Sequence, residues 1–324
     1  MITPGNSGAM KPRSLPWRSP RGVLGLTPPY GGLKDPCVVR LGDEWHLFAT
    51  GCKEGWTYDV VHAVAPHPLG PWTMLPPSVV TGATGPSTCA PGVVADGDRL
   101  HLFLHEAYNL LGGTVTHLVS DDAGASFAAV STALTALPGT AEAGLYDAHP
   151  GAVGGERYLV YSAFATVGEP DLHLARSESG TWDGPWERLG PVLAHDDVPF
   201  HNRRGCEHYE WGLEGGQLVE LPDGRTLLLG VCFLPTGAPG ARQRAFLAVA
   251  DRPAGPYELV GPALDPRSYG RTGENGHGAA VVHDGEVYLF FQHRDGDGLP
   301  WDLHVASVPA DALPGRAEPF AVVA

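Results

Sequence analysis

The stretch Asp35-Pro-Cys-Val-Val-Arg-Leu-Gly42, followed by Trp45-His-Leu-Phe48, contains an apolar strand, a glycine turn and a second apolar strand. Two strands joined by such a turn form a β-hairpin. The pattern returns four times, at Cys89–Gly97 with Leu100–Phe103, Asp147–Gly155 with Tyr158–Tyr161, Glu214–Gly224 with Leu227–Leu229, and His277–Gly285 with Tyr288–Phe291. Five copies of one hairpin predict a fold of five similar units.

A third strand follows each hairpin, and an aromatic residue then opens a fourth strand. These aromatic residues are Trp72, Phe127, Trp186, Tyr257 and Phe320. The turn glycines are 55 to 69 residues apart and the aromatic residues 55 to 71, so two markers keep one period. Units that cannot bury both faces alone predict an all-β, five-bladed β-propeller with four antiparallel strands per blade. We assign residues 28–324 to the propeller and residues 1–27 to an irregular N-terminal leader.

The composition agrees with short strands and turns. The 324 residues include 44 glycines and 31 prolines, which interrupt helices and central strands. The formal net charge of −15 argues against nucleic acid or an anionic membrane as a partner. Residues 1–27 lack the apolar stretch of a secretory signal, which predicts a cytoplasmic protein. The five cysteines have no zinc-like spacing, so we expect free thiols. Nothing in the sequence sets the oligomeric state.

In a propeller, the residues that open the innermost strands converge near the axis. Here these residues are Asp35, Cys89, Asp147, Glu214 and His277. Carboxylates brought together repel one another and raise at least one pKa. If these acids served only as turn residues, nothing would offset the free-energy cost of that repulsion. Three acids that open separate blades therefore predict a functional site at the axis.

At these residues the sequence resembles the five-bladed glycoside hydrolases of family 43 and the related families 32, 62, 68, 117 and 130. Lys34-Asp35-Pro36 is similar to the first-blade R-D-P of that family, Cys89-Ala-Pro to W-A-P, Asp147-Ala-His to I-D-A/P, Glu214-Gly-Gly to E-G-P, and Gly276-His277 to G-H. The order and spacing of the motifs carry the resemblance, from residue 28 onwards. The changes to Cys89 and to E-G-G leave the substrate more open than the reaction.

The resemblance implies hydrolysis of a glycosidic bond with inversion of configuration. Asp35 would be the general base, Glu214 the general acid, and Asp147 the residue that orients the acid and raises its pKa. An inverting pair needs room for a water, so the carboxyl groups of Asp35 and Glu214 should lie about 6.5–9.5 Å apart. Glu210 remains an alternative to Glu214, because it lies in the same short stretch.

Other residues are candidates for contacts to the sugar, partly because aromatic rings stack on its apolar face. The candidates are Cys89, His149, His208, Trp211, His277 and Trp301. In the related hydrolases a fifth-blade histidine often lies beside a central water or calcium ion. His277 is therefore also a candidate ligand of a structural calcium ion, and no cofactor is expected to be required. Regular recurrence indicates structural roles for His62, His117, His173, His304, Trp72 and Trp186.

These observations predict an exo-acting glycoside hydrolase for a neutral pentoside, such as an α-L-arabinofuranoside or a β-xyloside. The expected partner is a small carbohydrate. One alternative is a phosphorylase-type relative, in which Arg203, Arg204 and Arg271 would bind phosphate. Another is a carbohydrate-binding propeller without hydrolytic activity, although binding alone does not need three converging acids.

Overall fold

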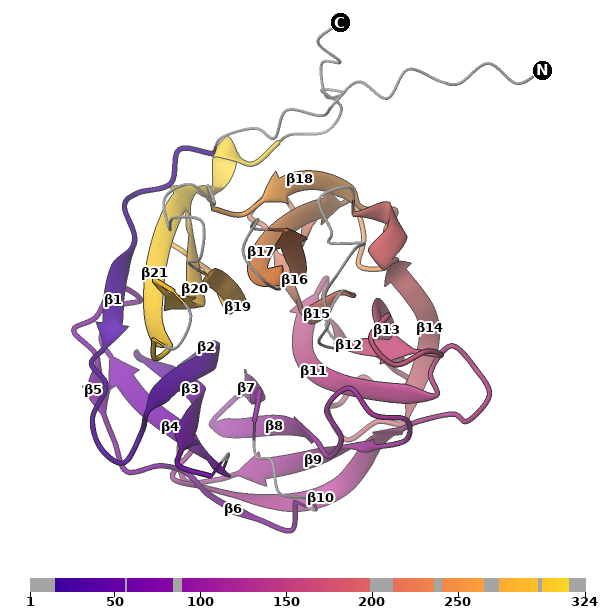
Figure 1. Cartoon of the computed structure of the whole chain (residues 1–324), viewed down its shortest axis with the longest axis horizontal. Helices are drawn as coiled ribbons and strands as arrows, with labels where there is room; N and C mark the ends of the chain where they lie inside the picture. The colour runs from indigo at the N-terminus through magenta and orange to yellow at the C-terminus, as the bar shows by residue number, and fades with distance from the viewer. Residues whose placement is uncertain are drawn as a thin grey trace, which may run out of the picture.

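The computed structural model of the protein describes residues 15–55, 57–83, 89–198, 212–235, 241–264, 274–296 and 299–314. The strands form twisted sheets arranged in a ring (Figure 1). The architecture is a β-propeller, which confirms the predicted fold class.

The blades follow one another along the chain. Blade one contains β2 (Gly32–Leu41), β3 (Glu44–Lys53), β4 (Thr57–Ala65) and β5 (Thr73–Met74). Blade two contains β6 (Val79–Thr81), β7 (Gly92–Asp96), β8 (Arg99–His105), β9 (Thr114–Ser120) and β10 (Ser126–Thr135). Blade three contains β11 (Gly144–Val153), β12 (Glu156–Phe164), β13 (Asp171–Ser177) and β14 (Trp186–Leu193). Blade four contains β15 (Glu214–Glu220), β16 (Thr226–Pro235), β17 (Ala241–Ala250) and β18 (Glu258–Pro262). Blade five contains β19 (Glu274–His283), β20 (Glu286–Arg294), β21 (Asp302–Pro309) and β1 (Arg21–Leu24). Nearest the centre of the ring lie β2, β7, β11, β15 and β19 (Figure 1).

The hydrogen bonding departs from four antiparallel strands per blade in two places. Strand β6 pairs in parallel with β10, so blade two has a fifth strand. A single parallel pairing of Arg244 with Asn275 joins the sheets of blades four and five. Within the described residues, one short 3-10 helix at His195–Asp197 follows β14 and another at Ala310–Ala312 follows β21.

The outermost strand of blade five corrects the prediction for the N-terminal segment. Strand β1 lies within the segment predicted as an irregular leader, and it pairs antiparallel with β21, with Arg21 opposite Val305. Phe320, which was expected to open this outer strand, lies outside the described residues. A four-residue strand between prolines is too short to show the apolar alternation by which strands are predicted. It is also distant in sequence from blade five, where it supplies the outer strand beside β21.

Apolar side chains pack between neighbouring blades and hold the ring together. Leu33 and Leu47 of blade one share a buried cluster with Phe290 and Val305 of blade five. Trp72 meets Phe290 edge to face, with ring centroids 5.8 Å apart. Trp72 therefore acts in packing, as its recurrence indicated.

Paired histidines recur inside two blades. His46 Nδ1 lies 3.0 Å from His62 Nε2 in blade one, and His101 Nδ1 lies 2.9 Å from His117 Nε2 in blade two. Burial is the main cause that lowers the pKa values of His62 and His117 to about 4, so both imidazoles are neutral near pH 7.

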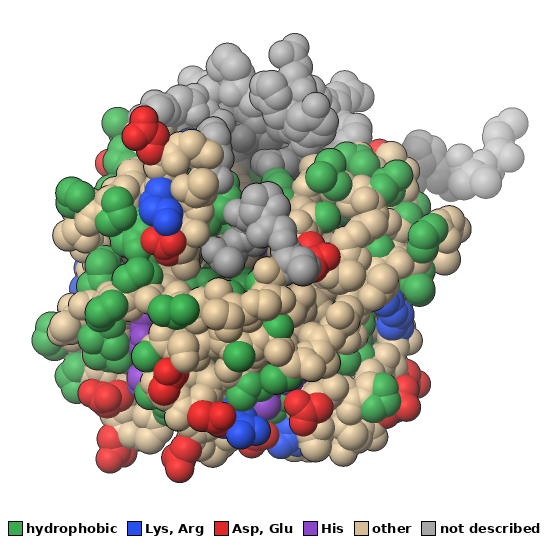
Figure 2. Space-filling view, turned by 90° about the horizontal axis from the view of Figure 1, so that it is seen from below, with side chains coloured by type: hydrophobic (Ala, Val, Ile, Leu, Met, Phe, Trp, Pro, Cys, Tyr) green, Lys and Arg blue, Asp and Glu red, His purple; other side chains and the backbone are tan. Residues whose placement is uncertain are grey.

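On the side of the molecule shown in Figure 2, acidic side chains are scattered and basic ones are few.

The cysteines within the described residues are free thiols; they are Cys37, Cys52, Cys89 and Cys232. Cys206 lies outside those residues. Among the described residues, no helix has the length and apolar character needed to cross a membrane.

The role of β1 in closing blade five can be tested at Leu24, which is buried in the cluster between blades one and five. Leu24→Ala should lower the free energy of unfolding by about 2–3 kcal/mol, because it removes buried methyl groups. Leu110, 61 % exposed, is a matched control, and Leu110→Ala should change stability by less than about 0.5 kcal/mol. Urea denaturation measures both changes, and equal losses would contradict the packing of β1.

Candidate active site

A β-bulge near the start of the innermost strand recurs in four blades. Two residues oppose a single residue of the neighbouring strand between Lys34 and Cys37, Tyr146 and His149, Glu214 and Gln217, and Asn275 and Gly278. Such a bulge bends the strand and redirects its side chains. Asp35 and Asp147 occupy the first bulge position with φ of 51° and 48°. Aspartate tolerates this left-handed conformation better than most residues do.

The bulges show that the opening residues are offset by one residue between blades. Glu214 precedes its bulge, and Gly215, with φ of 58°, takes the position that Asp35 and Asp147 have in their blades. His277 stands one residue later than that position in blade five. The expectation that these residues hold equivalent positions is therefore corrected, because the local backbone and not the residue count aims each side chain.

The opening residues nevertheless meet at one cavity of about 360 Å³. Those that line it are Asp35, Cys89, Asp147, Glu214 and His277. Its other walls are Lys34, Tyr58, Ala90, His105, Tyr108, Phe233, Gln243, Glu274, Gln292, Arg294 and Trp301. The cavity thus takes residues from all five blades.

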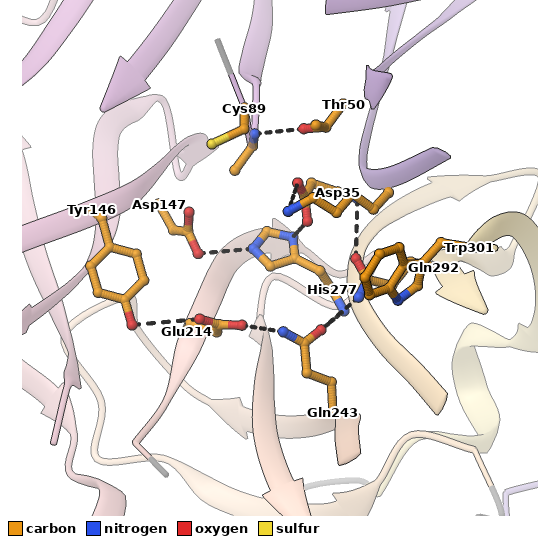
Figure 3. Close-up of polar contacts among 12 residues, drawn as sticks. Asp35, Thr50, Cys89, Tyr146, Asp147, Glu214, Gln243, His277, Gln292 and Trp301 are labelled. Atoms are coloured by element: carbon orange, nitrogen blue, oxygen red, sulfur yellow. Dashed lines mark hydrogen bonds and ion pairs between the residues drawn. The ribbon is translucent and has the colours of Figure 1, made fainter. Parts of the chain in front are cut away.

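His277 lies between two of the acids (Figure 3). Its Nε2 is 3.1 Å from Asp147 Oδ2, and its Nδ1 is 3.9 Å from Asp35 Oδ1. Burial alone would lower the pKa of His277, but the charges of Asp147 and Asp35 raise it to about 9. His277 is therefore an imidazolium at pH 7, and it compensates the charge of the two carboxylates.

The second contact of Asp147 is His105. Asp147 Oδ1 lies 3.4 Å from His105 Nδ1, and the Asp147 backbone N–H donates to the same nitrogen at 3.2 Å. Burial would raise the pKa of Asp147, but the charge and hydrogen bond of His277 hold it well below its usual range. Burial lowers the pKa of His105, so its ring is neutral at pH 7 and carries one N–H. Since Nδ1 accepts from the Asp147 backbone, the proton is on Nε2, which faces the Cys89 sulfur at 3.6 Å.

Glu214 is held by an amide and two hydroxyl groups. Gln243 Nε2 donates to Glu214 Oε1, while the hydroxyls of Tyr108 and Tyr146 lie 3.3 and 3.5 Å from Oε2. The orientation of the Gln243 amide follows from its neighbours, since the backbone N–H of His277 can only donate and faces Gln243 Oε1 at 3.3 Å. The NH₂ group of Gln243 must therefore face Glu214.

Asp35 and the opposite wall are arranged as ion pairs. Lys34 Nζ lies 3.3 Å from Asp35 Oδ2. Arg294 NH2 lies 3.1 Å from Glu274 Oε2, and the guanidinium covers the Trp301 ring at 4.6 Å from its centroid. Trp301 Nε1 also donates to Glu274 Oε1 at 2.9 Å. Glu274 thus fixes the wall that carries Trp301.

Of the remaining candidates for substrate contact, His149 is the one within the described residues. His149 is 1 % exposed and is not among the residues that line the cavity; its ring lies 5.6 Å from that of His277. His208, Trp211 and the alternative acid Glu210 lie outside the described residues, as do Arg203, Arg204 and Arg271.

The axial residues are a poor match for calcium, which takes six to eight oxygen ligands. His277 has a raised pKa of about 9 and faces two carboxylates, so both of its ring nitrogens carry protons near pH 7 and neither can be a metal ligand. The calcium ion stays a prediction, and no step of the chemistry is derived through it.

Sequence reasoning missed Glu274 at the start of β19 and three polar residues from second and third strands, which are Gln243, Gln292 and Arg294. A signal for two of them was present. In an antiparallel blade the second strand ends where the first begins, and β20 turns from apolar to polar at Gln292-His-Arg294, which is the end nearest the site.

The charge on His277 makes stability depend on pH. Its pKa is about 9 in the folded protein and about 6.5 in an unfolded chain, so its stabilising effect is complete below pH 6.5 and is lost as pH rises through 9. Between pH 6.5 and 10 the free energy of unfolding should fall by up to about 3 kcal/mol more than in His277→Gln. Urea denaturation across this range measures the difference, and parallel profiles for the two proteins would refute it.

Gly215 is a second test of the packing around His277. A Cβ atom at Gly215 would lie 2.6 Å from His277 Nε2, whereas one at Gly42, with a similar φ of 59°, would meet nothing within 4 Å. Both alanine variants bear the cost of the left-handed backbone, about 1–2 kcal/mol. Gly215→Ala should lose about 1–3 kcal/mol more than Gly42→Ala, by thermal or urea denaturation. Equal losses would show that His277 does not pack there.

No protein-family model and no curated protein matches the sequence, whereas solved structures match its fold. The catalytic domain of a family 62 α-L-arabinofuranosidase from Coprinopsis cinerea has a TM-score of 0.66 and 16 % identity, over 92 % of this chain and 98 % of that one. A thermostable family-43 glycoside hydrolase gives 0.61 and 17 %, over 87 % and 91 %. A family 32 β-fructofuranosidase from Bombyx mori gives 0.63 and 18 %, over 88 % and 62 %. At these identities the likeness concerns the fold, and this chain has the five-bladed β-propeller architecture of those hydrolases.

Proposed function

We propose that the protein is an inverting, exo-acting glycosidase that removes a neutral pentosyl group, α-L-arabinofuranosyl or β-xylosyl, from a small carbohydrate. The proposal rests on the convergence of Asp35, Asp147 and Glu214, from three blades, on one cavity. The similar folds of arabinofuranosidases and an endo-arabinase support this class of substrate.

Asp35 is the proposed general base. Its Oδ2 atom has no hydrogen-bond partner within the described part of the chain, although Lys34 forms an ion pair with it. The backbone N–H of Asp35 donates to Gln292 Oε1 at 3.3 Å, which helps to hold the residue at its bulge. A lone pair on Oδ2 is thus available to accept a proton from water.

Glu214 is the proposed general acid, and its contacts select the oxygen that carries the proton. Oε1 accepts from the Gln243 amide, which cannot accept in return. Oε2 faces Tyr108 and Tyr146, whose hydroxyls can donate or accept. The acid proton therefore belongs on Oε2, at the side of the cavity where Tyr108 stands.

Asp147 has a different proposed role from the repulsion that the sequence suggested. Its carboxylate is paired with the His277 imidazolium, which compensates much of its charge. Asp147 then acts as a positioning residue that fixes His277, and through it the spacing between blades one and three.

The reaction is a single displacement. Water attacks the anomeric carbon and gives a proton to Asp35, while the glycosidic C–O bond breaks and Glu214 Oε2 gives its proton to the leaving oxygen. The product is a free sugar of inverted configuration. After turnover Asp35 gives its new proton to solvent and Glu214 takes one up, so protons balance over the cycle.

Charge pairing supports a neutral substrate. Lys34 is paired with Asp35, Arg294 with Glu274, and His277 with Asp147. Among the described lining residues, no cation is left to meet a phosphate or a uronate. The volume of about 360 Å³ is at the small end for ligand pockets and suits one terminal sugar rather than a chain.

The roles of the two acids can be separated by leaving group. Glu214→Gln should abolish turnover of alkyl pentosides but spare 4-nitrophenyl pentosides more, because the nitrophenolate needs little protonation. Asp35→Asn should lower the turnover of both substrates by about 10²–10⁴-fold. The exposed pair Glu156→Gln and Asp98→Asn provides matched controls that should keep the native rate.

Proton NMR of the first-formed sugar tests the stereochemistry. Retained configuration would exclude the single displacement, and native activity in both active-site variants would exclude the assigned residues. Turnover that requires inorganic phosphate would favour the phosphorylase alternative. Binding without turnover of any pentoside would favour a carbohydrate-binding protein.

A further inference from the structure

A second group of polar side chains lies in blade five, next in sequence to residues that line the cavity. His293 is near the end of β20, and Asp302 and His304 begin β21. In the antiparallel register His293 stands opposite Asp302, and His304 stands opposite Phe291. Residues two apart on a strand share a face, so the three side chains lie on the same side of the sheet.

Polar atoms of the three side chains lie close together. His293 Nδ1 is 2.8 Å from Asp302 Oδ1, and His304 Nε2 is 3.2 Å from Asp302 Oδ2. The two imidazole rings are stacked, with centroids 4.1 Å apart. One donor atom from each residue falls within 4.8 Å of the others.

We propose that His293, Asp302 and His304 form a binding site for a zinc-like divalent transition metal ion. The ligands would be His293 Nδ1, His304 Nε2 and a carboxylate oxygen of Asp302, with water in the fourth position. Zinc bonds of about 2.0–2.2 Å in a tetrahedron place ligand atoms about 3.3 Å apart. Asp302 Oδ1 lies 2.8 Å from His293 Nδ1 and Oδ2 lies 3.2 Å from His304 Nε2, so either oxygen could be the ligand once the stacked imidazoles turn toward the ion.

The surroundings orient the ring of His293 for metal binding more than the ring of His304. Asp295 Oδ1 lies 3.3 Å from His293 Nε2, so it would hold the proton there and leave Nδ1 for the metal. His304 Nδ1 is buried and has no hydrogen-bond partner among the described residues. Since such outer partners change affinity by about 10–100-fold, we expect a dissociation constant on the order of micromolar, weaker than a complete structural zinc site.

The His101, His117 and Asp183 group is the natural comparison. Its two imidazoles are buried and repeat the pairing of His46 with His62, which indicates a packing role common to two blades. Blade five breaks that pattern, because Leu289 stands where His46 and His101 stand in their blades. The Asp302 side chain is 41 % exposed, which gives an ion a route from solvent.

The location gives the metal a structural consequence. Arg294 follows His293, and Trp301 precedes Asp302, and both line the cavity. An ion held between β20 and β21 would tie together the two ends of the segment that carries this wall. The site is independent of the reaction, and its occupancy does not test the proposed glycosidase activity.

Isothermal titration of the full chain with zinc chloride tests the proposal, together with the absorption spectrum of the cobalt-loaded protein. The native protein should bind one ion with micromolar affinity and show the intense visible bands of tetrahedral cobalt. Asp302→Asn should weaken that binding at least 10-fold. Asp183→Asn, the matched control at the other histidine pair, should retain it.

Circular dichroism establishes that each variant is folded, and His304→Gln serves as a second variant if Asp302→Asn is not. Absence of zinc binding in the native protein would overturn the proposal. Equal affinity in the native protein and in a folded Asp302 or His304 variant would overturn it as well, as would loss of the site in Asp183→Asn alone.

Discussion

The protonated imidazole of His277 between Asp35 and Asp147 is the contact on which the centre of the propeller depends. Two buried carboxylates from different blades would repel one another without a positive charge between them. The charge on His277 turns this repulsion into two attractions and links blades one, three and five at the axis. The same interaction accounts for Gly215, because any larger residue there would displace the ring.

Glu214 is controlled differently from the other two acids. Its oxygens contact the Gln243 amide and the hydroxyls of two tyrosines. Asp35 and Asp147 instead lie beside the cations of Lys34 and His277. Different surroundings for the carboxyl groups of one site are what separate acid and base roles require.

The sequence predicted the fold and the opening residues because both follow from local patterns. Period, turn glycines and alternation are set by neighbours in the chain, so five hairpins could be counted from residues alone. The one-residue offset of Glu214 could not be predicted, since a bulge depends on the pairing of two strands. Gln243 and Glu274 were missed for a related reason, because their roles come from contacts with residues of other strands and they carry no motif of their own.

The pairing of β1 with β21 also bears on how the molecule is made. Arg21 and Val305 are neighbours in the sheet although nearly the whole chain separates them. During synthesis β1 leaves the ribosome first and has no partner until β21 emerges. Contacts of such high sequence separation form late and slowly, because the loop between them must first be ordered. His277 also lies in blade five. A nascent chain that has completed the first four blades therefore contains Asp35, Asp147 and Glu214 but lacks the imidazolium that lies between the two aspartates. Folding of blade five thus completes both the charged centre of the propeller, through His277, and its outer ring, through the pairing of β21 with β1.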